Sequence, residues 1–263
     1  MASSIEAKVK VARVFRAARK LRGYRQDKLS KLIDNTQGTV SKIENATLIP
    51  DTAEWYLFCE KMNIDPDQTF STGYVISRTP IVNNSNFKVG KFKKVTCYVK
   101  VSSCIPFLLA IRELGYEDEF FPLLKKSKID RDVFVVINYE VPINVLQMMV
   151  DFLKSKIELK KTVAIVSKCF SQEYDKLIGN LNLGNLHELI TAFSVDEPYL
   201  NFEMIGNDIS ITLKPGLEED TFSADYIMFK ANFFNEVIKL GPLGKRASLQ
   251  KSDSSLGYNV TLS

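Results

Sequence analysis

The sequence has few of the residues from which metal centres and histidine-dependent active sites are built. Its 263 residues include one histidine and four cysteines. A single histidine excludes His-rich metal sites and most zinc enzymes that use two histidine ligands. The cysteines show no close pair with zinc-site spacing, so we expect free thiols in a reducing cytoplasm. They are Cys59, Cys97, Cys104 and Cys169.

Long apolar runs and phosphate-binding loops are also missing. No run approaches the roughly 18–20 apolar residues that cross a bilayer. The N-terminus leads into charged sequence instead of a signal-peptide core. The chain has neither a Gly-x-x-x-x-Gly-Lys loop nor a Gly-rich dinucleotide fingerprint. The short apolar runs lead us to expect no membrane span. The C-terminal part offers no histidine-supported nucleophile, and we therefore expect no enzymatic activity.

The positive charge of the chain is concentrated near its start. The formal net charge is +4, from 35 Lys and Arg against 31 Asp and Glu. Residues 1–66 hold 12 basic and 8 acidic residues, whereas residues 67–263 hold 23 of each. This asymmetry predicts an anionic partner for the N-terminal module.

Three short amphipathic stretches follow one another in this module. The apolar spacing predicts helices over 9–21, 26–33 and 37–45, and Thr36 is a good N-cap for the third. A short polar turn, Asp34-Asn35, separates the last two. Two short helices joined by a tight turn are typical of a helix-turn-helix, whose second helix enters the major groove of DNA.

These residues resemble the phage-repressor-type (xenobiotic-response-element-type) helix-turn-helix family, without gaps from about residue 19 to residue 64. The positions that match the family pattern are Arg19, Gln26, Leu29, Thr39, Ser41, Ile43, Glu44 and Pro50. The positions that depart from it are Ser30, Asp34 and Ala46, where the family has Ala, Gly and Gly. The turn tolerates Asp34 because Asp reaches the left-handed conformation more readily than most residues.

The resemblance implies a DNA-binding surface around the third helix. Gln37, Gly38 and Thr39 open this helix and would face base edges, where Gln pairs with adenine and Thr meets a thymine methyl group. The full set of predicted DNA-contacting residues is Arg19, Gln26, Gln37, Gly38, Thr39, Ser41, Lys42, Asn45 and Thr47. The alternative is that Gln37 and Thr39 are solvated helix residues. Glu44 is expected to stabilise the fold and not to contact DNA.

Beyond this module the sequence predicts a linker and a second domain. Clusters of Pro, Gly and Asn mark residues 67–94 as a linker. Residues 95–263 have a β-branched run at 133–137 and predicted helices over 105–115, 117–126, 142–157, 174–181, 186–193 and 224–240. A hairpin is predicted over 199–213, and residues 247–262 form either a last hairpin or a frayed polar tail. The chain is therefore predicted to be multi-domain, with an all-α domain at 1–66 and an α+β domain of helices and antiparallel hairpins at 95–263.

The order of these elements resembles heme–nitric oxide/oxygen-binding (H-NOX) sensor domains. The resemblance is carried by Asn185-Leu186-His187 before an apolar helix, with Tyr174-Asp175-Lys176-Leu177 upstream and Pro198 downstream. A histidine in this context is that family's proximal heme ligand, which implies His187 as a cofactor-binding residue. The family's Tyr, Ser and Arg heme-propionate clamp is replaced by Ser210, Thr212 and Lys214, and Lys cannot pair bidentately. His187 is therefore either a heme ligand or a helix histidine that hydrogen-bonds locally.

Together the two modules predict a cytoplasmic transcription regulator that binds double-stranded DNA. We expect a homodimer, because one helix-turn-helix reads only a half-site. The C-terminal domain would sense a small-molecule ligand or join subunits. The alternative is a DNA-binding adaptor whose C-terminal domain recruits a protein partner and takes no ligand.

Overall fold

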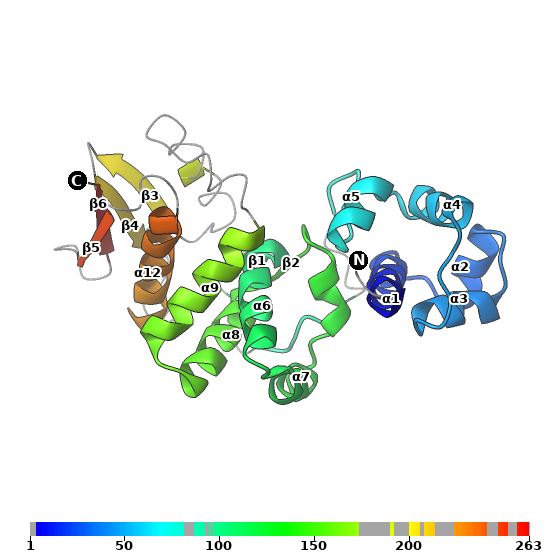
Figure 1. The fold of residues 1–263 in the computed structure, drawn as a ribbon, viewed down its shortest axis with the longest axis horizontal. Helices are drawn as coiled ribbons and strands as arrows, with labels where there is room; N and C mark the ends of the chain where they lie inside the picture. Colours follow the sequence, from blue (N-terminus) through cyan, green and yellow to red (C-terminus); the bar gives the residue numbers. More distant parts are fainter. Residues whose placement is uncertain are drawn as a thin grey trace. The chain divides into compact units, whose positions relative to one another are not determined.

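The computed structural model describes residues 4–81, 87–92, 95, 97–173, 190–191, 200–205, 208–213, 224–240, 247–251 and 257–262 (Figure 1). The chain divides into two compact units. Unit 1 comprises residues 1–91 and 123–140, and unit 2 comprises residues 92–122 and 141–263. A helical helix-turn-helix region is followed by a region that mixes helices with small antiparallel sheets, which confirms the predicted fold class.

Unit 1 is helical in its described part, and local signals set where its helices begin. Its elements are α1 (Ser4–Leu21), α2 (Gln26–Leu32), α3 (Gln37–Glu44), α4 (Thr52–Met62), α5 (Pro66–Thr72) and the 3₁₀-helix η2 (Arg131–Val135). Thr36 caps α3 as predicted, because its Oγ1 accepts a hydrogen bond of 3.0 Å from the backbone N of Thr39. In the turn before α3, Asp34 has φ +50°, which confirms the left-handed conformation expected there.

Aromatic stacking between α1 and α4 forms the centre of the unit 1 core. The rings of Phe15 and Phe58 are stacked, with centroids 3.7 Å apart and planes 8° from parallel. Trp55 lies tilted against both rings. The buried apolar residues that α2 and α3 add to this core are Leu29, Val40 and Ile43. Burial of each such side chain stabilises the fold by about 1.5–3 kcal/mol, so α2 and α3 are firmly packed and their polar faces remain outside.

The described residues of the predicted linker belong to unit 1 up to Lys91, and Phe92 is the first residue of unit 2. Helix α5 continues to Thr72, beyond the predicted boundary at residue 66. After it, Ser77 forms a β-bridge with Ile64, and the backbone N of Val75 donates a hydrogen bond of 2.7 Å to the carbonyl of Val135. The compact units therefore differ from the predicted domains 1–66 and 95–263, because these backbone pairings join residues far apart in the sequence.

In its described part, unit 2 combines helices with a two-stranded sheet and a four-stranded antiparallel sheet. Its described elements are β1 (Tyr98–Lys100), the 3₁₀-helix η1 (Val101–Cys104), α6 (Ile105–Glu113), β2 (Glu140–Pro142), α8 (Ile143–Lys156), α9 (Leu159–Glu173), β3 (Leu200–Ile205), β4 (Asp208–Leu213), α12 (Ala224–Leu240), β5 (Ala247–Lys251) and β6 (Gly257–Leu262). Helix α7 (Glu117–Lys126) crosses from unit 2 into unit 1, and β2 begins on the last residue of unit 1. The larger sheet has the strand order β3-β4-β6-β5.

Several predicted elements of the C-terminal part can be compared with these bounds. Both hairpins are confirmed, with Ile205 paired to Asp208 in the first and Ala247 paired to Leu262 in the second. The β-branched run at 133–137 does not form a strand of the kind such runs favour. Instead Asp130 caps the 3₁₀-helix η2, because its carboxylate accepts from the backbone N of Asp132. The predicted helices over 174–181 and 186–193 lie outside the described residues, apart from 190–191.

Phenylalanines from several elements fill the core of unit 2. Phe120 of α7 packs against Phe152 of α8, with ring centroids 5.1 Å apart. Phe202 of β3 packs against Phe234 of α12, with centroids 5.3 Å apart, and so joins the sheet to that helix. In the part of the chain that the structure describes, no helix combines the length and apolarity needed to cross a membrane.

Candidate nucleic-acid interface

The N-terminal end of α3 presents polar residues to solvent. Gln37 and Gly38 are exposed, and Thr39 is half-buried. The Thr39 hydroxyl lies 2.9 Å from the Thr36 hydroxyl, within hydrogen-bonding distance. The side chain of Gln37 is therefore available to an external partner, whereas the side chain of Thr39 is oriented by the helix cap.

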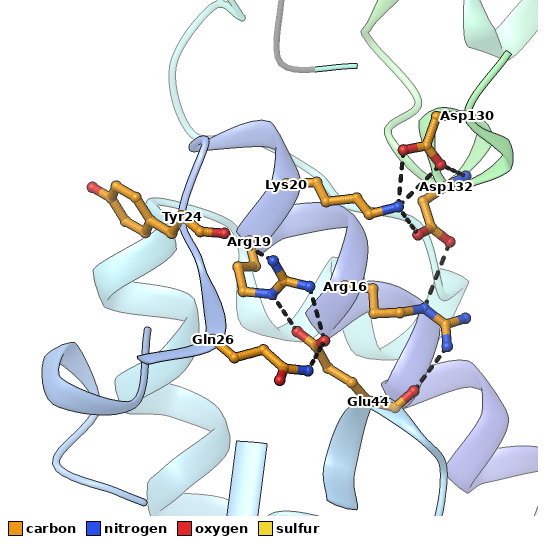
Figure 2. Close-up of polar contacts among 8 residues, drawn as sticks. All are labelled: Arg16, Arg19, Lys20, Tyr24, Gln26, Glu44, Asp130 and Asp132. Carbon is orange, nitrogen blue, oxygen red and sulfur yellow. Dashed lines mark hydrogen bonds and ion pairs between the residues drawn. The ribbon is translucent and has the colours of Figure 1, made fainter. Parts of the chain in front are cut away.

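The opposite end of α3 is fixed by a buried carboxylate (Figure 2). Glu44 is 2% exposed. Its two carboxylate oxygens accept hydrogen bonds of 2.6 and 2.9 Å from the Nε and one terminal nitrogen of Arg19. Gln26 Nε2 donates a third, of 2.8 Å, to the same group. Helices α1 and α2 thus hold α3 through one charge, which confirms the structural role predicted for Glu44.

Arg19 and Gln26 were predicted to contact DNA, and the structure places both in this internal network. The remaining terminal nitrogen of Arg19 donates to the carbonyl of Tyr24 at 2.8 Å, and the Arg19 side chain is only 14% exposed. The sequence does not show that these two side chains are bonded inside the unit, because their partner Glu44 lies on another helix, 25 residues beyond Arg19.

The remaining predicted residues lie at the C-terminal end of α3 and in the loop after it. Lys42, Asn45 and Thr47 are exposed. The Thr47 hydroxyl donates to the carbonyl of Lys42 at 2.9 Å, and Asn45 Nδ2 lies 3.4 Å from the hydroxyl of half-buried Ser41. These short-range bonds give the loop a defined shape and leave the amine of Lys42 directed to solvent.

A second polar network joins α1 to the segment that begins at Asp130, and sequence reasoning did not find it. Lys20 Nζ lies 2.8 Å from Asp130 Oδ2 and 2.7 Å from Asp132 Oδ2 (Figure 2). Arg16 lies 3.7 Å from Asp132, and it donates a hydrogen bond of 2.8 Å to the carbonyl of Glu44. Arg16 therefore connects η2 to the last residue of α3. No local pattern signals this network, because its partners are about 110 residues apart.

The electrostatics of the two units differ more than the sequence boundaries suggested. Unit 1 contains 19 Lys and Arg against 12 Asp and Glu, whereas unit 2 contains 16 against 19. Unit 1 is therefore basic and unit 2 is mildly acidic. Burial alone would lower the pKa of Lys20, but its hydrogen bonds to Asp130 and Asp132 outweigh burial and raise the pKa above the usual lysine value. Lys20 is thus fully charged at neutral pH.

The predicted cofactor site in the C-terminal part receives no support from the described residues. His187 and Lys214 lie outside them. Ser210 and Thr212 are two residues apart on β4 and therefore lie on the same face of the strand. The residues that alternate with them, Ile209 and Ile211, are buried. These two hydroxyls do not fit a heme-propionate clamp, because they supply neither a guanidinium nor an aromatic ring. Within the described ranges, no group of three His, Cys, Asp or Glu side chains could hold a metal ion.

The geometry of unit 1 agrees with the comparisons with known proteins. A family model described as helix-turn-helix matches residues 15–68. Residues 15–68 form a helix-turn-helix domain. This domain implies DNA binding, and transcription regulation is the role that fits it. The match confirms the family predicted for the N-terminal part and gives no support to the H-NOX resemblance. The searches of curated proteins and of solved structures returned no match.

Proposed function

We propose that the chain is a sequence-specific transcription regulator that reads DNA with the N-terminal end of α3. The observation that carries the proposal is the exposed start of α3, with Gln37 and Gly38, on a helix whose other end is fixed by buried Glu44. A helix held in this way loses little freedom on binding. Gln37 is assigned to an adenine edge and Thr39 to a thymine methyl group.

The other predicted DNA-binding residues take two different roles in this proposal. Lys42, Asn45 and Thr47 contact phosphates, because they are exposed beside the C-terminal end of α3. Ser41 orients Asn45 through their hydrogen bond. Arg19 and Gln26 act mainly by positioning α3, since their polar groups already bond to Glu44.

Selection of bound duplexes from a random pool at stated salt concentrations tests this function. Gln37→Ala is expected to relax preference at one base pair, a loss of about 1–3 kcal/mol in discrimination. Gln68→Ala is the matched control, because Gln68 is an exposed glutamine on α5. Equal loss of affinity for every sequence in Gln37→Ala would contradict the base-reading role.

The same selection bears on the proposed homodimer. A palindromic site with half-sites about 10 base pairs apart would be expected for two copies related by a two-fold axis. A single half-site, together with a monomeric mass in solution, would contradict the dimer.

For the C-terminal part we propose a role in ligand sensing or dimerisation, with protein recruitment as the alternative. A small molecule that raises the melting temperature would favour the sensor, since it binds the folded state. Heme binding through His187 predicts a heme absorption band in the wild-type protein. The control variant Arg25→Ala should keep this band, and His187→Ala should lose it. A protein that stays colourless with added heme would contradict it. The four free thiols are in keeping with the predicted cytoplasmic location.

A further inference from the structure

A short segment of unit 1, far from the helix-turn-helix in sequence, has exposed basic side chains and acidic side chains that pair with α1. Residues 125–132 carry four exposed cations, Lys125, Lys126, Lys128 and Arg131. The carboxylates of the same stretch, Asp130 and Asp132, are instead turned to Lys20 and Arg16 of α1. The acidic side chains are thus neutralised inside the unit, while the basic ones stay on the outside.

A second basic segment runs beside the first one. Val89 and Ile129 form an antiparallel β-bridge, and the backbone N of Asp130 donates to the carbonyl of Lys88 at 2.6 Å. Lys88 and Lys91 are both exposed. The backbone pairing therefore collects six exposed cations on one part of unit 1, which we name the basic flank: Lys88, Lys91, Lys125, Lys126, Lys128 and Arg131.

We propose that the basic flank binds the phosphate backbone of duplex DNA beside the site read by α3. This inference rests on the proposed function. The flank is fixed to α1 by the ion pairs that Lys20 forms with Asp130 and Asp132. Arg16 extends the connection, because it contacts both Asp132 and the carbonyl of Glu44, the residue before Asn45. Unit 1 therefore carries the flank and the predicted phosphate contacts of α3 on one connected framework.

The chemistry of the basic flank suits a duplex backbone better than a single strand. Five of its six cations are lysines, which act as point charges towards phosphates and read no sequence. Single-strand binding relies on aromatic side chains for base stacking. Within the flank segments, 87–91 and 123–132, the one aromatic residue is Phe87, and it is buried. The flank should therefore add affinity at every sequence and no specificity.

A matched pair of double variants of the full chain tests this proposal. Lys125→Gln/Lys126→Gln removes two adjacent exposed charges in the last turn of α7. Lys160→Gln/Lys161→Gln removes two adjacent exposed charges from α9 of unit 2 and serves as the control. Binding is measured by fluorescence anisotropy on labelled duplexes of about 30 base pairs, enough for two half-sites. One duplex comes from the selection and the other is its scrambled version.

The flank variant is expected to bind both duplexes more weakly by the same factor, up to about eightfold per lost contact at about 0.1 M salt. Its slope of log K against log salt should fall by up to about 0.9 per lost contact, while the control keeps the wild-type slope. A flank variant that matches the control in affinity and slope overturns the proposal. So does loss of binding to phosphatidylserine vesicles or single-stranded RNA in a flank variant whose duplex binding is unchanged.

The experiments distinguish an error in the flank proposal from an error in the proposed function. If only the flank proposal is wrong, Gln37→Ala still relaxes base preference, while the flank variant has the affinity and salt slope of the control. If base reading fails alone, Gln37→Ala changes nothing and the flank variant still lowers the salt slope. A wild-type chain that binds neither duplex overturns both. Circular dichroism melts of both lysine variants verify that each is folded at the assay temperature.

Discussion

At the residue scale, Glu44 is a charge whose burial is made possible by one arginine. Removing a single partner of a buried ion pair leaves the other charge uncompensated, which costs about 3–5 kcal/mol. Arg19→Ala is therefore expected to lower the free energy of unfolding by that amount in urea titrations. Arg25→Ala, at an exposed arginine six residues away, should change it by no more than about 0.5 kcal/mol.

A double variant separates the charge from the packing in this network. Replacing both partners, as Arg19→Met/Glu44→Leu, removes the buried carboxylate together with its cation. Apolar replacement of a whole buried pair is often neutral or stabilising. The double variant should therefore be more stable than Arg19→Ala. Equal instability of the two would contradict the explanation that an uncompensated Glu44 carboxylate destabilises Arg19→Ala.

The buried cysteines offer a second test at this scale. Burial raises the pKa of the Cys59 thiol to about 12, and burial with a bond to Glu113 raises that of Cys169 to about 12. Compared with an ordinary cysteine, the thiolate fraction at pH 8 is then about a thousandfold smaller. We expect iodoacetamide to leave both residues unmodified in the native protein and to label all four cysteines in guanidinium, as read by mass spectrometry. Native labelling of Cys59 as fast as in guanidinium would contradict its burial.

At the element scale, α3 ends in a motif that favours glycine but contains Ala46. The backbone N of Thr47 donates to Lys42 and that of Ala46 donates to Ile43, which is the Schellman pattern. Ala46 has φ +59°, a conformation that costs a non-glycine residue about 1–2 kcal/mol. Ala46→Gly should therefore raise the unfolding free energy by about 1 kcal/mol.

Replacing alanine by glycine inside a helix should instead lower the free energy of unfolding. Ala164 is exposed within α9, where glycine is about 1 kcal/mol less favourable than alanine. Thermal melts of Ala46→Gly and Ala164→Gly should therefore shift in opposite directions. A downward shift in both would mean that Ala46 is not strained.

Elements with local signals were predictable from the sequence, and elements that depend on distant partners were not. The start of α3 follows from the side chain of Thr36, and the β3–β4 hairpin from the turn residues around Asp208. In contrast, η2 has the β-branched composition of a strand, but Asp130 and Asp132 fix it against α1. The pairing of Arg19 with Glu44 also depends on a distant partner, because Glu44 lies on another helix.

At the scale of the whole molecule, unit 1 is built from two stretches of chain. Asp130→Asn/Asp132→Asn removes the carboxylates that pair with Lys20 and Arg16. Since both cations are about one-third exposed and can rehydrate, the expected loss is only about 1–2 kcal/mol. Hydrogen exchange should become faster in α1 and in residues 130–135, while α8 and α9 of unit 2 keep their protection. Uniform loss of protection in both units would contradict this local effect.

The discontinuity of unit 1 also sets an order of events during synthesis. Lys20 and Asp130 are 110 residues apart, so at about 5–20 residues per second roughly 5–20 s separate their translation. Through that interval the nascent α1 lacks the carboxylates that later pair with it. A ribosome that stalls within residues 92–122 would therefore hold a helix-turn-helix that is complete by its family pattern but still without part of its own ionic framework.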